Sequence, residues 1–299
     1  ILICIVTDLI NPVFVSLSNI LDVLRSISFT VIVAVGMTFV LISSGLDLSV
    51  GSAVGLTGMI TGWGLVNGLP IIICILLGVL TGVVIGLING FIIVKFKIPP
   101  LIVTLGMMYI ARGAVYVISK GRPFYPFPEA FKRIGQGTLF GIPYSIFIAL
   151  IVILIGHFIL NYTTFGRCVM AIGGNEETAR TSGININGTK VLIYTIVSAL
   201  CAISGILVAS RLSSSQANAG NGWEMTVIAS VIIGGTSLFG GAGSVIGTVI
   251  GVSIMTVLTN AMVLMNVSVY WQNIVVGAII ILAVGIDTYR IRVMSGNGR

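Results

Sequence analysis

Long apolar runs separated by short polar breaks make up most of the chain. Many of them approach about 20 residues, the length of a helix that crosses the hydrocarbon core of a bilayer. Because the sequence starts inside such a run, we expect the first helix to be truncated. The pattern predicts spans at 1–10, 20–44, 50–67, 70–94, 101–118, 143–162, 191–210, 225–239, 244–264 and 270–286.

The same runs distinguish helices from a membrane β-barrel. Barrel strands alternate apolar and polar residues over about ten positions. The run 71–77, Ile-Ile-Ile-Cys-Ile-Leu-Leu, shows no such alternation. The sequence therefore predicts an all-α, polytopic membrane protein with about ten transmembrane helices, in a single domain over residues 1–299.

Composition agrees with a membrane protein. Hydrophobic residues make up 57% of the 299 positions and charged residues only 8%, whereas a soluble domain carries about 25% charged residues. This excludes a cytosolic enzyme and a disordered chain. The 38 glycines suit closely packed membrane helices. A net charge of +7 favours anionic membrane lipid as a partner, and we expect no nucleic-acid partner.

Charge does not determine sidedness. Placing the segments around 95–97, 163–190 and the C-terminus in the cytoplasm puts eight basic residues inside and leaves seven nearer the other side. The positive-inside rule needs a clear excess on one side.

One face of the predicted span 70–94 carries a glycine at every fourth position. These helix-packing residues are Gly78, Gly82, Gly86 and Gly90. Such a groove allows a neighbouring backbone to approach closely. Static close packing and a surface on which helices slide during transport both fit the pattern.

A polar break holding one carboxylate separates the spans 20–44 and 50–67. Asp47 or Ser49 can cap the second helix and satisfy its free N–H groups. Alternatively, Asp47 lies on a substrate path, because an acid within a membrane domain is a functional candidate. Ser49 and Asn89 are the other candidates for this path.

The polar stretch 163–190 contains the pattern of a short capped helix. Asn175 is a suitable N-cap, and Glu176 and Glu177 occupy the first turn, where the helix dipole favours negative charge. Arg180 falls late in the helix and Gly183 follows its end. A helix of two turns is not stable alone, so we expect it to dock on a partner; a solvated loop is the alternative.

Several motifs of catalysis are absent from the sequence. It has no G-x-x-x-x-G-K-[ST] motif for ATP phosphates. It shows no Ser/His/Asp arrangement and no spacing typical of a metal site. We therefore predict no catalytic residue, no bound metal and no cofactor on this chain.

The sequence resembles the monosaccharide permease subunits of bacterial ABC importers, the branched-chain amino acid/ribose permease family. The motifs that carry this resemblance are Val-Gly-Met-Thr at 35–38, Ser-Gly-Leu-Asp-Leu-Ser-Val-Gly at 44–51, Lys-Ile-Pro-Pro at 97–100, Val-Thr-Leu-Gly-Met at 103–107, Arg-Gly at 112–113, Phe-Gly-Arg at 165–167, Ala-Ile-Gly-Gly-Asn at 171–175, Ser-Gly-Ile at 182–184, Ala-Ser-Arg-Leu at 209–212, and Ile-Gly-Gly-Thr-Ser-Leu-Phe-Gly-Gly at 233–241. They run in order over essentially the whole chain.

The resemblance implies a permease subunit of the bacterial inner membrane that forms the path for a sugar. Its expected partners are a second permease subunit (the same chain or a paralogue), a cytoplasmic ATPase that binds ATP and Mg²⁺, and an external sugar-binding protein. Residues 163–190 then face the ATPase and 119–142 face the exterior. The ATPase-coupling residues become Gly174, Asn175, Glu176, Glu177, Arg180 and Gly183.

Two other classes of transporter are alternatives to this interpretation. A secondary sugar transporter driven by an ion gradient needs titratable or ion-coordinating groups at the membrane midplane, and Asp47 is one of very few candidates. A passive channel needs a selectivity filter, and the sequence contains no recognisable one.

Overall fold

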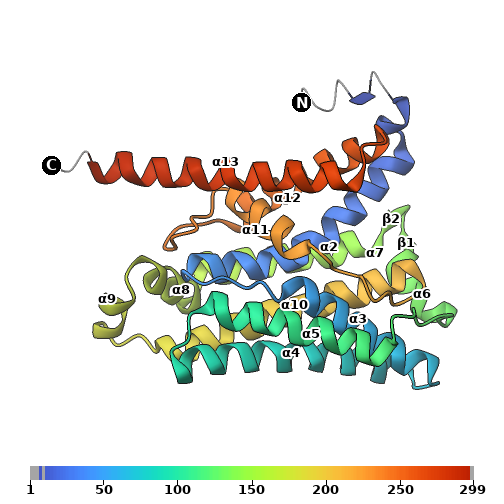
Figure 1. The fold of residues 1–299 in the computed structure, drawn as a ribbon, viewed down its shortest axis with the longest axis horizontal. Coiled ribbons are helices and arrows are strands. Elements are labelled where there is room, and N and C mark those ends of the chain that lie inside the picture. Colours follow the sequence, from blue (N-terminus) through green and yellow to red (C-terminus); the bar gives the residue numbers. More distant parts are fainter. Residues whose placement is uncertain (1–6, 9–10, 297–299) are drawn as a thin grey trace.

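A computed structural model describes residues 7–8 and 11–296, and these form a helical bundle (Figure 1). Its elements are η1 (Pro12–Val15), α2 (Leu17–Ile42), α3 (Val50–Val66), α4 (Ile71–Phe96), α5 (Pro100–Ser119), α6 (Glu129–Gln136), β1 (Thr138–Leu139), β2 (Ile142–Pro143), α7 (Tyr144–Tyr162), α8 (Thr164–Gly174), α9 (Glu176–Thr181), α10 (Ile186–Leu212), α11 (Trp223–Ile233), α12 (Val245–Leu264) and α13 (Val269–Gly296). The polytopic helical fold is confirmed.

Six described helices are long and apolar enough to cross a membrane: α2, α4, α5, α7, α10 and α12. Three further apolar helices are shorter, namely α3, α11 and the segment Val269–Gly285 of α13. The predicted count of ten is therefore approximate, and the span expected at 1–10 lies almost wholly outside the described residues. The span expected at 225–239 is wrong in length, because α11 ends at Ile233 and irregular chain follows.

The structure also contains three elements that the apolar pattern did not indicate. Helix α6 and the small antiparallel hairpin of β1 and β2 lie between α5 and α7. Helix α8 occupies the first part of the stretch 163–190, where Thr163 caps it by accepting a hydrogen bond from the N–H of Gly166. These elements are too short or too polar to resemble spans.

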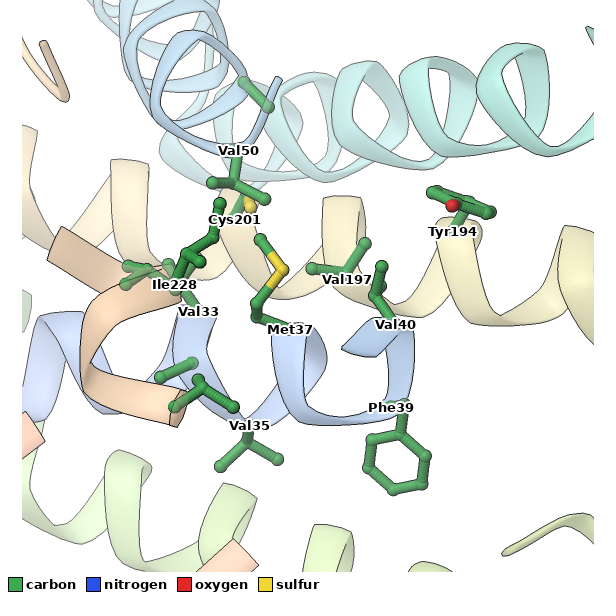
Figure 2. Packing of buried hydrophobic residues seen from close by; sticks show 14 of the residues in the cluster. Val33, Val35, Met37, Phe39, Val40, Val50, Tyr194, Val197, Cys201 and Ile228 are labelled. Carbon is green, nitrogen blue, oxygen red and sulfur yellow. The ribbon is translucent and has the colours of Figure 1, made fainter. Parts of the chain in front are cut away.

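The second half of α2 forms the centre of the bundle. Its residues are buried on all sides from Ser28 to Ile42, apart from Thr30. Figure 2 shows Met37 and Val40 of α2 facing Val197 of α10, with Ile228 of α11 nearby. A helix that is apolar around its whole circumference requires such burial.

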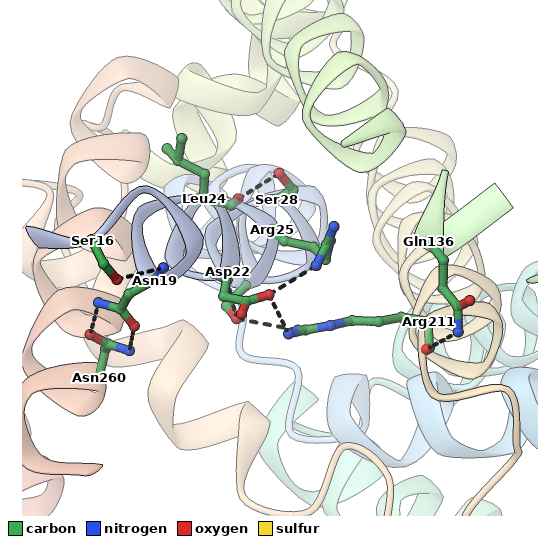
Figure 3. A network of polar contacts seen from close by, with 10 residues as sticks. Ser16, Asn19, Asp22, Leu24, Arg25, Ser28, Gln136, Arg211 and Asn260 are labelled. Carbon is green, nitrogen blue, oxygen red and sulfur yellow. Dashed lines mark hydrogen bonds and ion pairs between the residues drawn. The ribbon is translucent and has the colours of Figure 1, made fainter. Parts of the chain in front are cut away.

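Polar contacts attach the first turns of α2 to its neighbours (Figure 3). Asp22 accepts hydrogen bonds through Oδ1 from Arg25 at 2.9 Å and from Arg211 of α10 at 3.3 Å. Asn19 and Asn260 of α12 exchange side-chain hydrogen bonds of 3.1 and 3.0 Å. These contacts fix the α6 end of the bundle, where α2 starts and α10 stops.

The two halves of the bundle repeat one arrangement in opposite directions. In each half a long helix is followed by a break and a shorter helix: α2 and α3 in the first half, α10 and α11 in the second. Helix α4 packs on α10, and α12 packs on α2. Inverted repeats with broken helices are typical of transport proteins.

Candidate substrate path and coupling surface

The α2–α3 break places Asp47, Ser49 and Asn89 in one hydrogen-bonded cluster. Oδ1 of Asp47 accepts hydrogen bonds from the Ser49 N–H at 2.8 Å and from its hydroxyl at 2.6 Å. The Asn89 amide of α4 donates to Ser49 Oγ at 3.0 Å. All three residues are fully buried, so they bind the start of α3 to α4.

This geometry bears on the capping alternatives. Ser49 is the N-cap residue of α3, but its side chain makes no capping hydrogen bond. The expectation that the Ser49 side chain caps the helix is therefore wrong, because its hydroxyl donates to Asp47 instead. The Asp47 carboxylate accepts a hydrogen bond from the N–H of Ser49 at the start of α3. Contact of these residues with a substrate stays a prediction.

The rest of the break is held by α5 and α10. The carbonyl of Leu46 accepts hydrogen bonds from the hydroxyls of Thr104 at 3.3 Å and Tyr194 at 3.4 Å. A Cβ on Gly45 would lie 2.6 Å from the Tyr194 hydroxyl oxygen. The break is thus a fixed structure with hydrogen bonds from three neighbouring helices.

The short helix in the stretch 163–190 is α9, and its ends are capped as the pattern indicates. Oδ1 of Asn175 accepts the N–H of Thr178 at 2.9 Å. Gly183 has a φ of +80°. Its N–H donates a hydrogen bond to the Arg180 carbonyl, and the N–H of Ile184 donates to the Ala179 carbonyl. This pair of bonds is the Schellman motif.

An ion pair between Glu176 and Lys190 holds α9 against the start of α10. Glu176 contacts Lys190 at 2.7 Å and Arg180 at 3.3 Å. The hydrogen bond from Lys190 lowers the pKa of Glu176; partial burial opposes this shift, and the positive charges of Lys190 and Arg180 add to the lowering. Glu177 is exposed and has no ion pair within the described part of the chain.

The segment that carries α9 is attached to the end of α2. The Ser44 hydroxyl lies 3.1 Å from the carbonyl oxygen of Gly173 in α8 and 2.8 Å from that of Phe239. The N–H of Gly241 donates to the Ile42 carbonyl at 2.9 Å. These bonds join the end of α2 to α8 and to the α11–α12 connection. Gly174 is the last residue of α8, and a Cβ there would meet nothing within 4 Å.

The glycine stripe of α4 faces α10 and α3. A Cβ on Gly82 or Gly86 would overlap the carbonyl oxygens of Ser198 and Tyr194 in α10, respectively. Gly90 lies against Val191 of α10, and Gly78 against the Thr61 side chain of α3. The stripe therefore lets two helices approach closely within one chain.

Sequence reasoning missed a polar segment that packs along α3. Residues 213–222 connect α10 to α11, and Arg112 of α5 donates to the carbonyls of Ala217 at 3.1 Å and Ala219 at 2.9 Å. The polar run Ser-Ser-Ser-Gln-Ala-Asn at 213–218 between two apolar stretches was the available signal. The described residues contain no group of three or more His, Cys, Asp or Glu side chains suited to a metal ion.

Comparison with known proteins identifies the family. The family model described as "Branched-chain amino acid transport system / permease component" matches residues 19–284. The chain belongs to this permease family. No solved structure matches it.

Similar members of the family include sugar permeases. The chain is 44% identical to the ribose import permease protein RbsC of Haemophilus influenzae, covering 95% of this chain and 89% of the relative. It is 41% identical to RbsC of Bacillus subtilis, and the match covers 95% of this chain and 88% of the relative. It is 34% identical to the xylose transport system permease protein XylH of Escherichia coli, and the match covers 92% of this chain and 86% of the relative.

Family membership and the apolar helices together define the class of protein. The chain is a multi-pass permease of the bacterial inner (plasma) membrane, and it is a transporter component rather than an enzyme. The resemblance drawn from the sequence motifs is confirmed.

Proposed function

We propose that the chain is the permease subunit of an ATP-driven ABC importer for a monosaccharide. The observation that carries this proposal is the similarity to ribose import permeases over 95% of the chain. A secondary transporter driven by an ion gradient has no comparable support. A ribose-like pentose is the first substrate to test, because ribose and xylose permeases are both among the relatives.

We propose further that the chain works with partner subunits. A second permease subunit, either an identical copy or a paralogue, completes the path. A separate cytoplasmic ATPase binds ATP and Mg²⁺, since the sequence contains no P-loop. A binding protein delivers the sugar to the α6 end, and the surrounding partner is membrane lipid. Asp47, Ser49 and Asn89 would contribute by holding the broken segment at the path.

Helix α9 is the proposed coupling helix, and its end of the bundle is the proposed cytoplasmic side. Its exposed surface carries Glu177 and Arg180, while Glu176 is paired with Lys190. The bonds of Ser44 to Gly173 and Phe239 would transmit a displacement of α8 and α9 to α2. A short helix with capped ends and exposed charges suits a docking surface.

Reconstitution tests the proposed energy source. Proteoliposomes containing the permease and its ATPase should import ribose, presented with the binding protein, only when ATP is supplied. An imposed proton or sodium gradient without ATP should give no uptake. Uptake that follows the gradient and ignores ATP would contradict the proposal and favour a secondary transporter.

Charge reversal on α9 tests the coupling assignment. Glu177→Lys and Arg180→Glu should each reduce ATP-dependent uptake, because a coupling surface needs charge complementarity with its partner. Folding should change little: Glu177 has no ion pair among the described residues, and Arg180 loses only an exposed pair. Uptake and ATPase activity are measured together. Unchanged uptake in both variants would contradict this assignment.

A further inference from the structure

The polar segment 213–222 enters the membrane domain alongside α3. The Ser215 hydroxyl donates to the Gly58 carbonyl at 2.6 Å. Farther along, the Ala219 carbonyl lies 2.8 Å from where a Cβ on Gly55 would be, and Gly220 packs on the backbone of Gly51. The segment therefore descends α3 from its middle to its first turn.

The depth of this segment follows from helix geometry. Gly51 lies 15 positions before Val66, where α3 ends, which is about 22 Å along the helix axis at 1.5 Å per residue. The hydrocarbon core is about 30 Å thick. The tip of the segment, at Gly220, therefore lies well inside the membrane.

The segment carries polar side chains that face outward from the chain. Gln216, Asn218 and Asn221 are exposed, and their amide groups have no hydrogen-bond partner among the described residues. Irregular backbone at membrane depth is tolerated only where protein covers it or where it lines a water-filled cavity. Three unpartnered amides cannot face lipid tails, so this surface lines water.

Helix α5 provides the adjoining wall. Tyr109, Arg112 and Tyr116 recur at intervals of three and four, which places them on neighbouring positions of one helix face. The two tyrosines are 70% and 46% exposed. Arg112 uses only Nη1 in its bonds to the carbonyls of Ala217 and Ala219. Its other three N–H groups have no partner in the described chain.

A carboxylate completes the set of groups at the tip. Glu224 is half-buried in the first turn of α11, against Gly51 in the first turn of α3. Its charge interacts with that of Arg112. The N-terminal turns of two half-helices thus meet at membrane depth beside an acid, a base and several amides.

We propose that this face is a sugar-binding subsite within the permease, formed by Tyr109, Arg112, Tyr116, Asn218, Asn221 and Glu224. The inference rests on the proposed function and identifies a site at which the sugar binds during transport. Amides, an arginine and a carboxylate bind neutral hydroxyl groups as donors and acceptors, and tyrosine rings cover the apolar face of a sugar ring. The opposite charges of Arg112 and Glu224 favour a neutral ligand over an ion.

Thiol labelling tests whether the face is wet. In a chain whose four cysteines are replaced by alanine, Asn218→Cys, Asn221→Cys and Tyr116→Cys are compared with Leu154→Cys on α7. Leu154 is 59% exposed on an apolar helix, so it serves as the lipid-facing control. In nanodiscs that expose both membrane faces, a charged, membrane-impermeant thiol reagent should modify the first three positions and leave the control unmodified. Absence of modification at all three would overturn the inference.

Transport kinetics test whether the wet face binds sugar. Asn218→Ala, Asn221→Ala and Glu224→Gln should each raise the KM for ribose uptake by roughly tenfold, the effect of one or two lost hydrogen bonds. The matched control is Asn161→Ala, which removes an exposed asparagine from α7. Of these variants, only Asn161→Ala is expected to keep both the KM and the sugar-free ATPase activity of the unmodified complex.

The outcomes separate this inference from the proposed function. If the unmodified complex imports ribose and the three variants keep its KM, the subsite is overturned and the importer function stands. If the unmodified complex imports no sugar of a panel of ribose, L-arabinose and xylose, the proposed function fails, and the sugar subsite fails with it. A raised KM in the three variants, with the control unchanged, supports the subsite.

Discussion

Individual polar residues inside the membrane domain fall into two groups. Asp47, Ser49 and Asn89 are fully buried and bond mainly to one another, so they act on backbone geometry. Arg112 and Glu224 are only partly buried and lie where irregular chain reaches membrane depth. Burial and hydrogen bonding, rather than residue type, separate a structural polar residue from one that faces a path.

Substitution of Asp47 tests its role at the residue scale. Asp47→Asn keeps an oxygen that accepts the Ser49 N–H, so we expect nearly normal thermal stability in detergent and nearly normal uptake. Asp47→Ala leaves that buried N–H without a partner and should cost about 1–3 kcal/mol of stability. A folded Asp47→Asn protein with sharply reduced uptake would instead show that the charge itself acts on the path.

At the scale of elements, short helices and close contacts depend on a few specific groups. Helix α9 has six residues and is held by its caps and by Glu176. The contact of α4 with α10 depends on glycines that leave no room for a side chain. In both cases one substitution removes the feature that positions a whole element.

Protonation of Glu176 should release α9. Its folded-state pKa is lowered below the ordinary value of 4.5, so the ion pairs stabilise the docked helix above that pH. This contribution is lost as the pH falls through the lower, folded-state pKa. Hydrogen exchange at α9 amides should be faster in Glu176→Gln at neutral pH. Equal protection in Glu176→Gln and the unmodified protein would contradict this role.

Enlarging the glycine stripe should disrupt the α4–α10 contact. Gly82→Leu and Gly86→Leu each place a side chain against the backbone of α10, so yield and thermal stability in detergent should fall markedly. Gly106→Leu on α5 is the control, because a Cβ there meets nothing within 4 Å. Stability equal to that of the unmodified protein in both stripe variants would contradict the packing role.

At the scale of the whole molecule, two inverted halves place their broken helices together. The first turns of α3 and α11 meet at membrane depth through Gly51 and Glu224. In a single chain, no other helix covers the exposed face of α5. The same holds for the exposed face of α13 in the described residues, where Tyr270 is 82% exposed. A second permease subunit would cover these faces and enclose a path between them.

Native mass spectrometry tests this arrangement. The complex purified with its ATPase should contain two permease copies and two ATPase copies, because one chain leaves the polar segment 213–222 open. A single permease chain in an active complex would contradict the proposed path. A paralogue in place of the second copy would retain the path and show a heterodimer.

Features that depend on local signals could be predicted from the order of residues. The lengths of apolar runs located α2, α4, α5, α7, α10 and α12 to within a few residues, because crossing a bilayer requires a set number of apolar positions. The caps of α9 were readable for a similar reason, since Asn175 and Gly183 act within one turn of the helix.

Features that depend on contacts between distant segments could be seen only in the folded chain. The end of α11 at Ile233, the course of residues 213–222 along α3 and the pairing of the α4 glycines with α10 all depend on neighbours far away in sequence. The hydrogen bond of Asn89 to Ser49 joins residues 40 positions apart. Apolar periodicity records whether a position is buried but not which segment buries it, so these partners became visible only in the folded chain.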